Sequence, residues 1–212
     1  MNTSYHLTRH SLVRRGLRLS LATIGYNSLE GVIAVAAGLA AGSVALVGFG
    51  VDSVIEVGAS LTAIWRLRAD ADERRREEVE RWSLRLIGLS FLGLAAYVVF
   101  DALRSLIGRE PPSQSPIGIG LTALSLIVMP LLARAKRRVA AALGSSALTS
   151  EAQQTVFCTY LSAIVLTGLV LNATLGWWWA DPAAALAMTP FIVREGIDGM
   201  RGRACSDAAC CP

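Results

Sequence analysis

Long apolar runs separated by short polar connections dominate the pattern of the chain. The runs lie near residues 19–41, 43–65, 83–107, 117–133, 152–175 and 178–198. An α-helix needs about 20 predominantly apolar residues to cross a bilayer. The pattern therefore predicts an all-α fold, a bundle of six transmembrane helices.

Composition agrees with this class of protein. The 212 residues are 53% hydrophobic and 17% charged, and the mean hydropathy is +0.50. Soluble domains carry about 25% charged residues. The net charge of +4 does not indicate a nucleic-acid partner, because the basic residues flank the apolar runs; the expected partner is the lipid bilayer. The chain shows no hydrolase triad, no His-rich metal centre and no phosphate loop, which argues against an enzyme.

The distribution of Lys and Arg predicts the orientation, because cytoplasmic loops retain positive charge. Of the 20 basic residues, only Arg104 and Arg109 fall on one side of the predicted membrane. Both termini are therefore predicted to be cytoplasmic, in a bacterial inner (plasma) membrane. The expected organisation is a basic N-terminal segment over 1–18, a membrane domain over 19–202 and a cysteine-rich tail over 203–212.

The first run has an alternative interpretation as a cleaved signal peptide, since a basic segment precedes it. Its apolar part is longer than the usual 7–15 residues or so of such signals. In addition, Glu30 interrupts the run. A first transmembrane helix is therefore the preferred interpretation.

Two carboxylates, Asp52 and Glu56, lie near the middle of the second run. Residues four apart stack on one helix face, with Cβ atoms about 5–6 Å apart. A charge at the bilayer centre costs at least about 2.5–3.5 kcal/mol on insertion scales, so such residues usually have a function. Carboxylate oxygens are ligands of divalent cations. The pair predicts a cation or proton site at the membrane midplane.

The first run also contains polar residues, Asn27 and Glu30, three apart on roughly one face. Two interpretations remain open. The side chains satisfy each other or a neighbouring helix, or they line an ion path, since an intramembrane carboxylate is a functional candidate by default.

The fifth run begins with a polar stripe of Ser150, Gln154 and Cys158 at intervals of four residues. Antiparallel packing of the second and fifth helices would place Asp52 level with Cys158 and Glu56 level with Gln154. A buried Cys commonly acts as a small hydrophobic residue. Opposite two carboxylates, however, Cys158 becomes a candidate thiolate ligand.

Three cysteines, Cys205, Cys210 and Cys211, lie within the last eight residues. On the reducing cytosolic side stable disulfides are not expected. Such a cluster suits the capture of a thiophilic metal. Lipidation of these cysteines is the alternative.

With these features the chain resembles the cation diffusion facilitator family of metal/proton antiporters over about residues 18–202. The residues that carry the resemblance are Tyr26-Asn27, Gly50-Val51-Asp52-Ser53-Val54-Ile55-Glu56 and Trp179-Ala180-Asp181-Pro182-Ala183. In that family, two ligands four apart on the second span face a second pair on the fifth. Together they form a tetrahedral site for zinc or a similar ion.

The resemblance implies Asp52 and Glu56 as ligands from the second span. The pair on the fifth span, usually His and Asp, falls on Gln154 and Cys158. Gln is a poor Zn²⁺ ligand and does not titrate, whereas Cys is a soft ligand, so this departure bears on proton coupling. The family's cytoplasmic C-terminal domain has no counterpart in the sequence, which has the cysteine tail in its place. A homodimer is still expected, since six-span bundles of this kind commonly pair.

The expected function is export of a divalent cation such as zinc, cadmium or cobalt from the cytosol in exchange for protons. The metal is the transported substrate, and no resident cofactor is expected. Protonation of the carboxylates would release the ion, since metal and proton compete for the same oxygens. The alternative is a non-transporting membrane protein that senses metal or acts as a scaffold through its cysteine tail.

Overall fold

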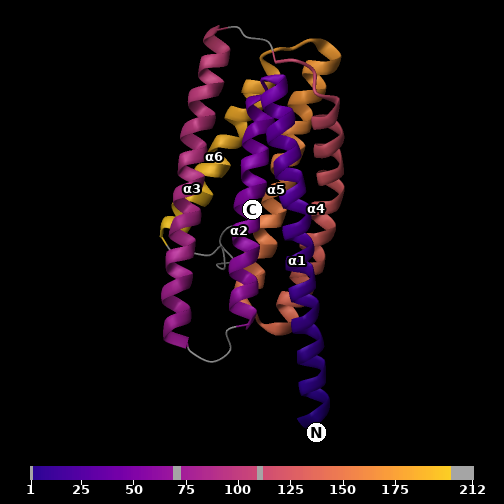
Figure 1. Ribbon diagram of the computed structural model, residues 1–212, viewed down its shortest axis with the longest axis vertical. Helices are drawn as coiled ribbons and strands as arrows, with labels where there is room; N and C mark the ends of the chain where they lie inside the picture. The colour runs from indigo at the N-terminus through magenta and orange to yellow at the C-terminus, as the bar shows by residue number, and fades with distance from the viewer. Residues whose placement is uncertain (1, 69–72, 109–111, 202–212) are drawn as a thin grey trace.

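The computed structural model describes residues 2–68, 73–108 and 112–201, and within these ranges the chain is all-α (Figure 1). It forms the helices α1 (Asn2–Ala41), α2 (Val44–Arg68), α3 (Glu73–Gly108), α4 (Pro116–Leu143), α5 (Ser146–Leu175) and α6 (Ala180–Met200). The prediction of a six-helix all-α bundle is therefore confirmed. The orientation of the termini stays a prediction.

The helices run along the long axis of the molecule, with α2 in the middle (Figure 1). The closest neighbours are α1 with α2, α3 with α6, and α4 with α5, while α2 and α5 also pack against each other. In the part that the structure describes, α1 to α5 are long and apolar enough to cross a membrane. The shorter α6 is not in that group, and its 21 residues include Asp181, Arg194, Glu195 and Asp198.

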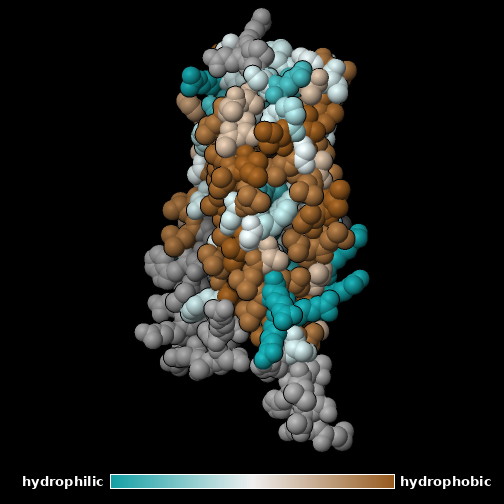
Figure 2. All heavy atoms as spheres, turned by 45° about the vertical axis from the view of Figure 1, so that its right-hand side comes forward, coloured by the Kyte–Doolittle hydropathy of each residue, from teal (hydrophilic) through white to brown (hydrophobic). Residues whose placement is uncertain are grey.

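The surface of the bundle is apolar in its middle. On the face that Figure 2 shows, hydrophobic side chains cover most of the central part, and hydrophilic side chains gather toward the two ends. Large side chains such as Leu29, Val32 and Phe100 lie on the outside. This distribution suits contact with lipid, because lipid tails impose no penalty on exposed apolar groups.

Several helices extend beyond the apolar runs that predict them, and α4 shows the consequence. It continues to Leu143 and ends at Gly144, whose φ of 61° lies in the left-handed region. Lys136 follows the fourth apolar run, where the sequence pattern alone suggests a polar connection. Lys136 lies within α4, and its exposure is 0%. Residues 133–143 are rich in Ala and Arg, which favour helix, so the helix continues past the apolar run.

The first two helices form a tight hairpin, joined by Gly42 and Ser43. Gly42 has a φ of 67°, which favours glycine. Ser43 Oγ accepts a hydrogen bond from Leu46 N at 3.1 Å and donates one to Asp181 Oδ1 at 2.5 Å. Asp181 is fully buried. A carboxylate at a helix N-terminus is stabilised by the helix dipole, so Asp181 of α6 holds the start of α2.

Close contact between α1 and α2 depends on Gly50. A Cβ atom at this position would lie 2.7 Å from Val35 Cγ2 and 2.8 Å from Val35 N, which is backbone. No side chain fits without separating the two helices. This contact places the carboxylates of α2 against the polar residues of α1.

Substitution of Gly50 by alanine is expected to destabilise the bundle by about 1–3 kcal/mol, because overpacking forces backbone shifts. Unfolding in detergent micelles would measure the effect. The control is Gly93→Ala, since a Cβ atom at this helical glycine meets nothing within 4 Å. Equal stability of the two variants would contradict the close contact of α1 with α2.

Candidate metal site

Three carboxylates from α1 and α2 come together inside the bundle. The exposed fractions are 1% for Glu30, 3% for Asp52 and 1% for Glu56. Ser53 Oγ donates a hydrogen bond to Glu30 Oε2 at 3.0 Å, which links the two helices. The electrostatic neighbours of Asp52 are Glu56, Glu30 and, from α6, Glu195. The carboxylates therefore face the protein core and avoid the lipid.

The face of α5 that meets these carboxylates carries Cys158, which is 1% exposed. Its thiol lies close enough to interact electrostatically with Glu56 and Asp52. Gln154 is only half-buried. The α5 residue in direct contact with Glu56 is Thr155, whose Oγ1 donates a hydrogen bond to Glu56 Oε1 at 2.7 Å. A ligand role for Gln154 stays a prediction.

The buried polar face of α5 therefore differs from the predicted stripe. Its members are Glu151, Thr155, Cys158 and Ser162. They follow one another at intervals of four, three and four residues. Because a helix has about 3.6 residues per turn, this spacing and the strict four-residue spacing both describe one face, and both include Cys158.

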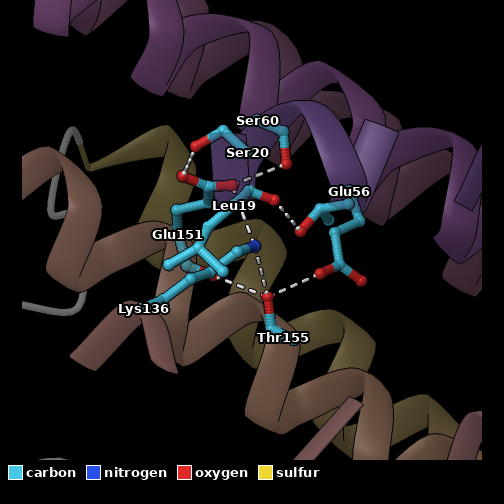
Figure 3. A network of polar contacts seen from close by, with 8 residues as sticks. Leu19, Ser20, Glu56, Ser60, Lys136, Glu151 and Thr155 are labelled. Atoms are coloured by element: carbon cyan, nitrogen blue, oxygen red, sulfur yellow. Dashed lines mark hydrogen bonds and ion pairs between the residues drawn. The ribbon is translucent and has the colours of Figure 1, made fainter. Parts of the chain in front are cut away.

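A buried ion pair adjoins the carboxylates (Figure 3). Lys136 Nζ of α4 lies 2.8 Å from Glu151 Oε1 of α5, and the two side chains are 0% and 1% exposed. Ser60 donates a hydrogen bond to Glu151 Oε1 at 2.9 Å, and Ser20 donates one to Oε2 at 2.7 Å. Each oxygen of Glu151 is therefore paired, with partners from α1, α2 and α4.

Thr155 connects this ion pair to the candidate ligands. Its Oγ1 accepts a hydrogen bond from Lys136 Nζ at 2.9 Å while it donates to Glu56 (Figure 3). A continuous polar network thus runs from Glu151 through Lys136 and Thr155 to Glu56. We call these four residues the Lys136 network.

Neither the polar roles of Glu151 and Thr155 nor the buried position of Lys136 was predicted from the sequence. A usable signal was present, because Met129, Ala133, Lys136 and Ala140 recur at helical spacing and form one buried face of α4. The neighbouring residues Arg134, Arg137 and Arg138 hid it. With Lys136 they form a run of basic residues, which is typical of an exposed connection between helices.

Six buried polar atoms next to the carboxylates have no hydrogen-bond partner among the described residues. They are Tyr26 OH, Asn27 Oδ1, Asn27 Nδ2, Glu30 Oε1, Glu56 Oε2 and Ser125 Oγ. Of the two interpretations of Asn27 and Glu30, a hydrogen bond to a neighbouring helix holds for Glu30, whose Oε2 accepts from Ser53 of α2, whereas no hydrogen bond joins Asn27 to Glu30. A buried unpaired polar group costs about 1–3 kcal/mol. Such a cluster suits water molecules or a cation, which would supply the missing partners.

The described residues contain no group of three His, Cys, Asp or Glu side chains already arranged to hold a metal ion. Glu56 directs Oε1 toward Thr155. Coordination of an ion by Asp52 and Glu56 therefore requires Glu56 to use its unpaired Oε2 or to rotate. The tail cysteines Cys205, Cys210 and Cys211 lie outside the described residues.

Membrane-length helices that bury carboxylates, an ion pair and unpaired polar atoms define a polytopic membrane protein with a polar core. The sequence model of the family described as the cation efflux transmembrane domain matches residues 20–199. The chain belongs to this family, and the predicted membership of the cation diffusion facilitators is confirmed.

Known relatives agree with this assignment. The chain is 28% identical over 170 residues to an uncharacterized transporter of Synechocystis sp., an alignment that covers 76% of the chain and 54% of that protein. It is 26% identical over 208 residues to the cation-efflux pump FieF of Salmonella choleraesuis, covering 90% of the chain and 68% of the pump. With FieF of Shewanella oneidensis it shares 25% over 107 residues, which is 50% of the chain and 36% of that pump. The chain thus spans only part of the length of these relatives.

Proposed function

We propose that the chain moves a divalent metal cation across the bilayer and that Asp52 and Glu56 bind this cation. The observation that carries the proposal is the burial of both carboxylates where α2 faces α5. Two negative charges in a medium of low dielectric constant repel each other strongly. One divalent cation would neutralise both, so the pair suits a divalent ligand.

Cys158 is the proposed third ligand, and Gln154 or a water molecule the fourth. Oxygen and sulfur donors together suit Zn²⁺, Cd²⁺ or Co²⁺. Cys158 supports this assignment by its burial and by its electrostatic interaction with both carboxylates. The cysteine tail would capture metal on the cytoplasmic side before it enters the site.

Transport would be export from the cytosol in exchange for protons. Two of the relatives are named cation-efflux pumps, and the Lys/Arg distribution favours cytoplasmic termini in an inner membrane. Asn27 and Glu30, with their unpaired atoms, would line the ion path. Rocking of the bundle would expose the site to each side in turn. The unit in the membrane would be a homodimer.

Reconstitution of the full chain into proteoliposomes tests this function. With an acidic lumen, uptake of Zn²⁺ or Co²⁺ is expected to exceed uptake without a pH gradient, and the lumen is expected to become less acidic as metal enters. Fluorescent metal and pH indicators in the lumen measure both fluxes. Metal flux no faster than in empty liposomes would contradict transport, and metal flux without proton flux would contradict exchange.

A second candidate function is metal sensing or scaffolding through the tail. Two observations favour it. Glu56 accepts a hydrogen bond from Thr155, and Gln154 occupies a position where the family usually has a histidine. This function predicts metal bound by Cys205, Cys210 and Cys211 with no flux. The same proteoliposome experiment separates the two candidates.

A further inference from the structure

We propose that Lys136 is a resident cation that lowers the affinity of the site for its metal. The lower affinity allows the metal to dissociate. The inference deepens the proposed transport function and rests on it. It assigns Lys136 as a positioning and affinity-determining residue that acts on the metal through Thr155 and Glu56.

The first basis is geometry. The ammonium of Lys136 is fully buried, 2.8 Å from Glu151 Oε1 and 2.9 Å from Thr155 Oγ1. Thr155 in turn donates to Glu56 Oε1 at 2.7 Å. Only two hydrogen bonds therefore separate the ammonium from a candidate ligand (Figure 3).

The second basis is charge. Among the residues whose burial the structure describes, Lys136 is the only buried basic residue, whereas Glu30, Asp52, Glu56 and Glu151 are buried acidic residues. At Glu56 the electrostatic effect of Lys136 exceeds the opposing effect of Glu151. A divalent cation bound at Glu56 would experience the repulsion of Lys136 in addition to the attraction of the surrounding carboxylates. Charges interact more strongly in the protein interior than in water, so this repulsion lowers affinity.

The third basis is the orientation of Glu56. Thr155 accepts from Lys136, and its own hydroxyl proton has two acceptors within reach, Glu56 Oε1 at 2.7 Å and the backbone oxygen of Glu151 at 3.0 Å, of which Glu56 is the nearer. Glu56 Oε2 is left without a hydrogen-bond partner among the described residues. Lys136 therefore holds one oxygen of Glu56 in place and leaves the other available to a cation.

A purely structural role for the ion pair makes the opposite prediction for affinity. If Lys136 only fastened α4 to α5, its removal would loosen the site and weaken metal binding. If it acts as a resident cation, its removal strengthens binding and slows release. The sign of the change in affinity separates these roles.

Equilibrium binding of Cd²⁺ by the purified full chain tests the inference, in a parent in which Cys205, Cys210 and Cys211 are replaced by Ser. Lys136→Met is expected to lower Kd at least about tenfold, which corresponds to about 1.4 kcal/mol, and to reduce turnover of metal in proteoliposomes. Lys136→Arg keeps the charge and is expected to stay near the parent in both measurements. An unchanged or higher Kd in Lys136→Met would overturn the inference.

The double variant Lys136→Met/Glu151→Gln covers the case in which the single variant does not fold. It leaves no buried unpaired charge, and it is expected to bind Cd²⁺ more tightly than the parent, by a smaller factor than Lys136→Met. Weaker or equal binding would again overturn the inference. Failure of the transport function has a different signature, because the parent itself would then move no metal.

Discussion

Replacement of Asp52 by alanine is expected to lower the initial rate of metal uptake into proteoliposomes at least about a hundredfold. Loss of residues that merely support a metal ligand already costs about 10–100-fold in affinity or activity. Asp52 is proposed as a ligand itself, and it is almost fully buried. Uptake would be followed with a luminal metal indicator at equal protein content.

The matched control for this variant is Asp101→Ala. Asp101 is an acidic residue of the same bundle that lies on α3, where Tyr97 OH donates to it at 3.4 Å. Because Asp101 lies outside the proposed site, its replacement is expected to leave the uptake rate near that of the unsubstituted chain. Equal uptake by Asp52→Ala and Asp101→Ala would show that the metal does not bind at Asp52.

Replacement of Glu151 by alanine is expected to destabilise the folded chain by about 3–5 kcal/mol. Removal of one partner from a buried ion pair leaves an uncompensated charge. Here that charge is the fully buried ammonium of Lys136. Thermal or denaturant-induced unfolding in micelles would measure the loss through Trp fluorescence.

The control is the double variant Lys136→Met/Glu151→Leu, which replaces both charges by apolar side chains of similar size. Such replacements are often neutral or stabilising, so the double variant is expected to regain most of the lost stability. A loss of only about 1 kcal/mol in Glu151→Ala, the size seen for exposed pairs, would contradict a buried pair.

Much of the fold follows from the sequence because membrane-length apolar runs give a strong signal. The helix that carries Asp52 and Glu56 was predicted from its apolar run, and the structure has this helix and buries both carboxylates. Helix ends were predicted less well. Hydropathy marks where apolar residues stop, whereas α4 continues through a charged segment that still favours helix.

The polar details of the site were the hardest part to predict. Spacing shows that residues of α5 share a face, but it does not decide between Gln154 and Thr155, which are neighbours in the sequence. The direction of each side chain depends on packing against α2 and α4. Lys136 shows the same limit, because its partner Glu151 lies on another helix and its charge alone suggests an exposed position.

The metal content of a variant without tail cysteines tests the central claim most directly. In this variant Ser replaces Cys205, Cys210 and Cys211, so any tightly bound metal must be held by the helical bundle. Equilibrium dialysis against Zn²⁺ or Cd²⁺, followed by elemental analysis, is expected to show a single ion per chain, and further substitution of Asp52→Asn and Glu56→Gln is expected to abolish it. A tail variant that binds no metal, or one that keeps its ion after loss of both carboxylates, would contradict a metal site between α2 and α5.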